Sequence, residues 1–261
     1  MSTTDAERSE RLPPLLVQAL HIVARAEASG VCLRLTGSLG VRSHCTERAQ
    51  LFELLGREQY GDIDFIGRSK ERGRITPLFQ SMGYEPDLEM VRAEEFGTQR
   101  LIFEQPETKV KVDVFLDQLQ MCHTLDFRKR LDLDNPTTAL VDLLLAKLQI
   151  HDITEKDLVD IVVLLAEHPV SRGPETIDES ELLRRLGDDW GFCESATRNL
   201  TLVVEFLEGW GGPDRTKSEL LTAVRLVSEL VAACPKSVRW RMRAKLGTRV
   251  PWYQEVEDVT R

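Results

Sequence analysis

The clearest pattern in the chain is a strict alternation of polar and apolar residues in two short segments. In residues 61–66, Asp62 and Asp64 alternate with apolar residues, and in residues 109–115 Asp113 alternates with three valines. Successive side chains of a β-strand point to opposite faces, so each segment separates a polar face from an apolar one. The pattern predicts two strands that carry carboxylates on one face and pack into a core with the other.

Elsewhere the hydrophobic spacing predicts a mixed first part and a helical second part. We expect strands at 31–36, 62–66, 100–104, 110–116 and 121–126, with a hairpin joining the third and fourth. We expect helices at 12–29, 47–55, 75–82, 136–150, 154–167, 179–186, 194–208, 217–233 and 237–245. Residues 168–178 contain Pro169, Gly173 and Pro174, which is typical of a linker. The sequence therefore predicts an α+β domain over residues 1–168 and an all-helical domain over residues 169–261.

Gly37 and Ser38 follow the first expected strand and precede a helix start. A tight connection is the simple interpretation of this pair alone, because glycine suits such turns anywhere. The functional interpretation is that backbone N–H groups and the hydroxyl bind a phosphate at a helix N-terminus.

The three aspartates favour the functional interpretation. Exposed carboxylates on one strand are common, but Asp62, Asp64 and Asp113 lie on two strands whose other residues are mostly apolar. Clustered carboxylates repel one another, and a hard divalent cation such as Mg²⁺ or Mn²⁺, which prefers oxygen ligands, would compensate them.

Lys147 falls in the middle of an apolar helical arc formed by Leu140, Leu143, Leu144 and Leu148. Lysine is rarely buried without a partner, so two interpretations stay open. Its stem lies along the apolar surface with the ammonium group in water, or the side chain enters a cleft and binds a triphosphate. On the next helix, Asp157 is expected to pair with Lys147 or Lys156, and Asp160 to lie on a solvated face.

Together these residues resemble the nucleotidyltransferase fold superfamily, over roughly residues 30 to 165. Its members carry a Gly-Ser turn, an Asp-x-Asp pair on the next strand and a third Asp on a later strand. Within this superfamily, the motifs most resemble those of small bacterial nucleotidyltransferases, including AbiEii-type toxins and the aminoglycoside nucleotidyltransferase group. The Gly-Ser-x-x-x-Arg pattern of these proteins matches residues 37–42, and their helical Lys followed by Lys/Arg-Asp-x-x-Asp matches Lys147 and residues 156–160. An insertion at 43–60 departs from the family pattern.

The resemblance implies a small mixed sheet flanked by helices and a magnesium-dependent enzyme. The implied reaction moves a nucleoside monophosphate from a nucleoside triphosphate to an acceptor hydroxyl and releases pyrophosphate. The catalytic and metal-binding roles fall on Asp62, Asp64 and Asp113. Nucleotide binding falls on Gly37, Ser38, Arg42 and Lys147. The insertion leaves open an alternative, a non-catalytic nucleotide-binding or regulatory module of the same fold.

Composition and charge limit the location of the protein and the molecules that it can bind. The net charge is −9, and no apolar run reaches the ~18 residues that a membrane span needs. Residues 1–11 lack the apolar core of a secretory signal, and the five cysteines form no Cys-x-x-Cys pair, which favours reduced thiols in a cytoplasmic protein and argues against structural zinc.

The acceptor is left open among a small molecule, an RNA end and a protein hydroxyl. The overall acidity favours a small cationic acceptor such as an aminoglycoside over RNA. Residues 236–250 contain several cations and no acidic residue. The simplest interpretation of this run is a solvated helix face. If the run is a binding surface, it favours RNA or an acidic partner. The sequence specifies neither the base of the nucleotide nor the oligomeric state.

Overall fold

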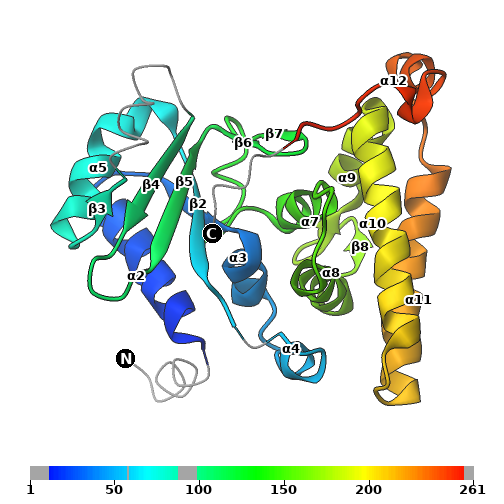
Figure 1. Cartoon of the computed structure of the whole chain (residues 1–261), viewed down its shortest axis with the longest axis horizontal. Helices are drawn as coiled ribbons and strands as arrows, with labels where there is room; N and C mark the ends of the chain where they lie inside the picture. The colour runs from blue at the N-terminus through cyan, green and yellow to red at the C-terminus, as the bar shows by residue number, and fades with distance from the viewer. Residues whose placement is uncertain (1–11, 58, 88–98, 256–261) are drawn as a thin grey trace. The chain divides into compact units, whose positions relative to one another are not determined.

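Both carboxylate-bearing strands lie at the centre of a five-stranded sheet in the computed structural model, which describes residues 12–57, 59–87 and 99–255 (Figure 1). The strand order is β1-β2-β5-β4-β3. The strands are β1 (Leu33–Thr36), β2 (Asp62–Gly67), β3 (Glu85–Pro86), β4 (Arg100–Glu104) and β5 (Lys111–Leu116). β2 and β5 run parallel, and the other neighbours run antiparallel. The mixed sheet and the β4–β5 hairpin that the sequence predicts are therefore confirmed.

One face of the sheet packs against two helices, α2 (Pro14–Ala28) and α5 (Arg72–Ser81), in a single core. The strands contribute their alternate apolar residues, among them Ile63, Phe65, Val112 and Val114, and the helices contribute Leu16, Ile22, Ile75 and Phe79. Burial of one face fixes the register of a strand, because a one-residue shift would exchange its faces. The core therefore also determines which side chains lie on the polar face of β2 and β5.

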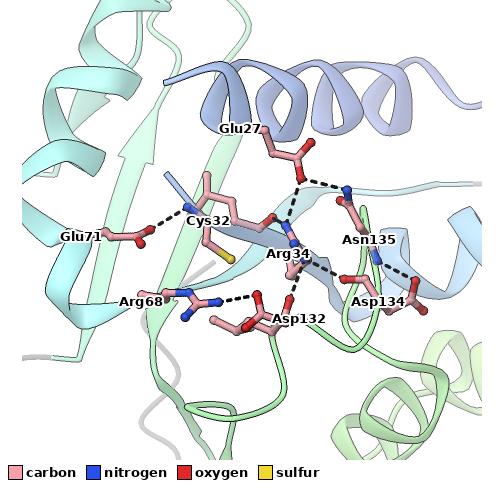
Figure 2. A network of polar contacts seen from close by, with 10 residues as sticks. Glu27, Cys32, Arg34, Arg68, Glu71, Asp132, Asp134 and Asn135 are labelled. Atoms are coloured by element: carbon pink, nitrogen blue, oxygen red, sulfur yellow. Dashed lines mark hydrogen bonds and ion pairs between the residues drawn. The ribbon is translucent and has the colours of Figure 1, made fainter. Parts of the chain in front are cut away.

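Arg34 holds a loop beside β1 (Figure 2). Its buried side chain donates hydrogen bonds to the carbonyl oxygens of Leu131 (2.9 Å) and Asp134 (2.7 Å), and its Nη1 lies 3.5 Å from a carboxylate oxygen of Glu27. These acceptors satisfy a charge that would be costly to bury alone. The loop leads to Thr137, which forms an isolated parallel bridge with β1 next to the Gly-Ser turn.

This bridge explains why the helix expected from Pro136 begins later. The carbonyl oxygen of Pro136 accepts a bond from the Leu35 N–H, and the Thr138 N–H donates to the Leu35 carbonyl oxygen, both at 2.9 Å. Because the backbone at 136–138 pairs with β1, the helix α7 spans only Leu140–Leu148.

The chain packs as two compact units. One comprises Met1–Ser43, Gln59–Leu119 and Asp126–Ala139, and the other comprises His44–Glu58, Gln120–Leu125 and Leu140–Arg261. This division groups α7 with the C-terminal helices, whereas the sequence places a domain boundary after residue 168, which stays a prediction.

The second unit is mainly helical. Besides α7 it contains α4 (Gln50–Leu54), α8 (Glu155–Glu167), α9 (Glu179–Asp188), α10 (Trp190–Gly209), α11 (Asp214–Ala233) and α12 (Val238–Ala244). Single 3₁₀ turns lie at Ser69–Glu71 in the first unit and Gly247–Arg249 in the second. The predicted fold class, a small mixed sheet with flanking helices followed by a helical part, is confirmed.

Two short segments differ from the sequence-based expectation. The linker expected at 168–178 holds a parallel pair, β8 (Val170–Ser171) and β9 (Ile177–Asp178), because Val170 and Ile177 are apolar and buried. The part after residue 168 is therefore not entirely helical. The strand expected at 121–126 is instead a short two-stranded sheet of β6 (Gln118–Gln120) and β7 (Thr124–Asp126).

Residues 46–48 of the insertion at 43–60 contact α8 within the second unit. The carboxylate of Glu167 accepts hydrogen bonds from the backbone N–H groups of Thr46 (3.0 Å), Glu47 (3.1 Å) and Arg48 (2.9 Å). Across the described ranges, no helix combines the length and the apolar character needed to cross a membrane.

Candidate functional site

A row of side chains crosses four strands on the polar face of the sheet. The register pairs Thr36 with Asp64, Asp64 with Asp113, and Asp113 with Ile102. Neighbouring strands lie about 4.8 Å apart, and register partners face the same side. Asp62 lies two residues before Asp64 and therefore shares its face. The structure thus brings the three predicted carboxylates onto one face of two adjacent strands.

The Gly-Ser turn lies against this row. Gly37 begins α3 (Gly37–His44) with a φ of +63°, in the left-handed region that favours glycine. A Cβ atom at this position would lie 2.4 Å from Oδ2 of Asp64, so a larger residue would collide with the carboxylate. Ser38 is half-buried at the start of the same helix, and Arg42 is buried further along it. The predicted turn and the second aspartate of the Asp-x-Asp pair are therefore in close contact.

Asp113 forms an ion pair with Arg100 on the neighbouring strand β4. The Arg100 Nη2 atom lies 2.8 Å from Oδ2 of Asp113, and Nε lies 3.3 Å from Oδ1. Two guanidinium nitrogens thus each face one carboxylate oxygen, the fork-to-fork geometry that strengthens such pairs. Arg100 lies two residues before Ile102, the register partner of Asp113, so it shares the polar face. A guanidinium group therefore offsets the charge of the third carboxylate.

The residues fit a divalent cation by donor type and by register. All three side chains supply hard oxygen ligands, and Asp64 and Asp113 are direct neighbours across parallel strands. Across residues 12–57, 59–87 and 99–255, however, no group of three or more His, Cys, Asp or Glu side chains has the arrangement of a metal site. The described conformation is therefore not a closed ligand shell, and Arg100 contacts one of the proposed ligands.

Lys147 is buried in the second unit and does not extend to the surface. Its Nζ atom lies 2.7 Å from Oδ1 of Asp157 and 2.8 Å from Oδ2 of Asp160. The Nε atom of Arg57 lies 3.3 Å from Oδ1 of Asp160, so two cations and two carboxylates form one buried cluster. The expected pairing of Asp157 is confirmed. The expectation of a solvated Asp160 is wrong, because its side chain is fully buried against these cations.

The cluster shifts two pKa values. Burial lowers the pKa of Lys147 and the carboxylates of Asp160 and Asp157 raise it, and the net pKa lies above its ordinary value. Burial raises the pKa of Asp157 and Lys147 lowers it, and the net pKa lies below its ordinary value. Both groups are therefore charged near neutral pH. The predicted contact of Lys147 with a nucleotide stays a prediction.

Sequence reasoning missed two cations, Arg100 and Arg57. The signal for Arg100 was present: in the strand at 100–104, Arg100, Ile102 and Glu104 alternate with buried Leu101 and Phe103. With the hairpin register, this alternation places Arg100 on the face of Asp113. No comparable pattern identifies Arg57, because its contact with Asp160 joins residues 103 positions apart.

Comparison with known proteins gives little further information. No protein-family model matches the chain, and no curated protein matches it. One similar solved structure is the solution structure of the antibiotic-resistance factor ANT(2'')-Ia, at 12% identity, covering 84% of this chain and 94% of that chain with a TM-score of 0.32. A TM-score of 0.32 is too low to assign a function to this chain.

Proposed function

We propose that this chain is a metal-dependent nucleotidyltransferase that moves a nucleoside monophosphate from a nucleoside triphosphate to an acceptor hydroxyl. The observation that carries the proposal is the pairing of Asp64 and Asp113 in register on adjacent parallel strands, with the Gly37 turn packed against Asp64. A helix start beside paired carboxylates provides donors for phosphate oxygens and ligands for a cation within one small surface.

In the proposed reaction, the acceptor oxygen forms a bond to the α-phosphorus of the triphosphate. The bond from that phosphorus to the oxygen bridging the α- and β-phosphates breaks, and pyrophosphate leaves with the electron pair. Asp113 takes up the proton of the acceptor hydroxyl. Mg²⁺ or Mn²⁺, held by Asp62, Asp64 and Asp113, would neutralise phosphate charge and acidify the hydroxyl.

The remaining predicted residues bind the triphosphate. The backbone N–H groups at Gly37 and Ser38 and the Ser38 hydroxyl would donate to phosphate oxygens at the N-terminus of α3. Arg42 on the same helix would balance the charge of the departing pyrophosphate. The same role for Lys147 would draw its ammonium group away from two carboxylates.

The partners of the reaction follow from charge. An excess of nine negative charges favours a small cationic acceptor such as an aminoglycoside over RNA, although the cations at 236–250 would suit RNA. A cytoplasmic location is part of the proposal, since all five cysteines are thiols and not disulfides, as in a reducing compartment.

The test is release of pyrophosphate from each nucleoside triphosphate with Mg²⁺ and mixed acceptors, compared between wild type and Asp64→Asn. Asp132→Asn is the matched control, since it removes an exposed carboxylate of the same unit that pairs with Arg68. We expect wild type and D132N to release pyrophosphate and D64N to lose release by at least about 100-fold. Equal release by D64N and wild type would refute the catalytic role. Nucleotide binding without release would favour the non-catalytic module.

A further inference from the structure

The guanidinium group of Arg100 lies beside Asp113, where a metal cation would bind. Its guanidinium group faces both oxygens of that carboxylate, at 2.8 Å and 3.3 Å. The Asp113 side chain is 12% exposed and the Arg100 side chain 31% exposed, so Asp113 is the less accessible partner. The guanidinium fork uses one lone pair on each carboxylate oxygen, and a divalent cation on the same carboxylate would lie within a few ångströms of the guanidinium charge. The two cations repel each other at that distance, so a metal ion that binds Asp113 competes with these two contacts.

Arg100 contacts the ring of Phe115 at the same time as it pairs with Asp113. Its guanidinium carbon lies 5.1 Å from the centroid of the Phe115 ring, within the range of a cation–π interaction. Phe115 is the register partner of Arg100 on β5, so the contact is fixed by the sheet. A side chain released from Asp113 would therefore stay on the ring without rearrangement of the strands.

We infer that Arg100 and a divalent cation compete for Asp113, so that Arg100 regulates loading of the metal site. This inference rests on the proposed function, because it concerns the same carboxylates. With Arg100 on Asp113, the charge of the third carboxylate is offset and the ligand set is incomplete. With Arg100 released from Asp113 and held by the Phe115 ring alone, Asp113 joins Asp64 as a ligand. The guanidinium group thereby protects the acidic face from loose cation binding and sets a higher threshold concentration for the metal.

The first test is calorimetric titration of Mn²⁺, without nucleotide, into wild type, Arg100→Gln and Arg68→Gln. R68Q is the matched control: it removes an equal charge from another ion pair of the same unit, that of Arg68 with Asp132. A partly exposed ion pair is weak, so R100Q should bind Mn²⁺ about twofold to fivefold more tightly than wild type. R68Q should bind as wild type does. Equal affinity in R100Q and R68Q, or weaker binding in R100Q, would overturn the inference.

A second measurement uses the wild-type protein alone and does not depend on the folding of a variant. Phenylglyoxal modifies accessible arginine side chains, and peptide mass spectrometry reports the modification of Arg100. Saturating Mn²⁺ should increase the modification rate of Arg100 and leave that of Arg68 unchanged. An unchanged or slower rate at Arg100 would contradict displacement.

Failure of the inference can be distinguished from failure of the proposed function. If wild type binds Mn²⁺, D64N does not, and R100Q matches wild type, only the competition is refuted. If wild type itself binds no Mn²⁺ under these conditions, the metal-dependent function and the competition are both refuted.

Discussion

Replacement of Lys147 by Met should destabilise the second unit strongly. The ammonium group is the partner that Asp157 and Asp160 share, at 2.7 Å and 2.8 Å, and its side chain is only 7% exposed. Met keeps the stem and the helix propensity, so the change removes essentially the charge alone. Breaking a buried ion pair from one side costs about 3–5 kcal/mol, because the remaining charge stays buried.

The loss should fall toward the lower end of this range. Arg57 still contacts Asp160 at 3.3 Å, and Asp157 keeps the hydroxyl of Thr154 as a donor at 2.8 Å. Adding Asp157→Asn to K147M restores the charge balance of the cluster with Arg57 and Asp160. The double variant should therefore recover at least half of the lost free energy of unfolding.

Tryptophan fluorescence during urea unfolding is a suitable assay. All four tryptophans, Trp190, Trp210, Trp240 and Trp252, belong to the second unit, so the signal reports that unit alone. A loss below about 1 kcal/mol in K147M, the size of an exposed ion pair, would refute the reasoning. So would a double variant that is less stable than K147M.

The pH dependence provides an independent check. The pKa of Asp157 is depressed, so its contribution to stability is present above its ordinary pKa of 3.8 and is lost as pH falls through the lowered value. The pKa of Lys147 is raised, so its contribution is complete below its ordinary value of 10.5 and is lost as pH rises through the raised value. The difference in stability between wild type and K147M should therefore be largest near neutral pH and shrink in acid.

The remaining predictions concern the turn, the aspartate beside it and the basic run. Gly37→Ala should lower the free energy of unfolding by at least about 1–2 kcal/mol, because φ is +63° and the new Cβ would collide with Asp64. An unchanged melting temperature would contradict this. Asp64→Ala should abolish pyrophosphate release and leave the melting temperature equal or higher, because a repelling carboxylate is removed; a large decrease would assign Asp64 a structural role. The exposed Arg239, Arg241 and Arg249 can be replaced by glutamine to test the basic run. If RNA is the acceptor, this variant should bind RNA more weakly, and the salt slope of binding should fall by about 0.7 per lost contact. If the acceptor is a small molecule, turnover should not change.

Arg243 is excluded from this last variant for a structural reason. Its guanidinium group donates to the carbonyl oxygens of Gly247 (2.9 Å), Val250 (2.9 Å) and Pro251 (3.2 Å). It also lies 4.7 Å from the ring centroid of Trp190. Its replacement would loosen the C-terminal segment, and a weaker affinity for RNA would then have two causes.

Local periodicity predicted the sheet and the face of each aspartate. The alternation around Asp62, Asp64 and Asp113 is a period of two residues, and burial of the interleaved apolar residues determines the register. Gly37 was found for a related reason, because a turn before a helix favours glycine. The collision that makes it necessary, with Asp64, depends on how β1 and β2 pair and could not be read from either segment alone.

Long-range contacts explain what the sequence did not predict. The ion pair of Arg57 with Asp160 and the hydrogen bonds of Arg34 to the loop at 131–134 join residues about a hundred positions apart. Asp160 was expected in water because carboxylates usually are, and two cations from other segments reverse that expectation. Pro136 was expected to begin a helix because it suits a first turn, but pairing with Leu35 occupied the backbone there.

A crystal structure with Mn²⁺ and a non-hydrolysable nucleoside triphosphate would test the proposed function most directly. The proposal predicts anomalous density for Mn²⁺ at about 2.0–2.6 Å from oxygens of Asp64 and Asp113, with phosphate oxygens at the Gly37–Ser38 turn. The competition inferred for Arg100 predicts in addition that Arg100 has left Asp113. Mn²⁺ and triphosphate bound elsewhere, with the Arg100–Asp113 pair intact, would contradict the proposal.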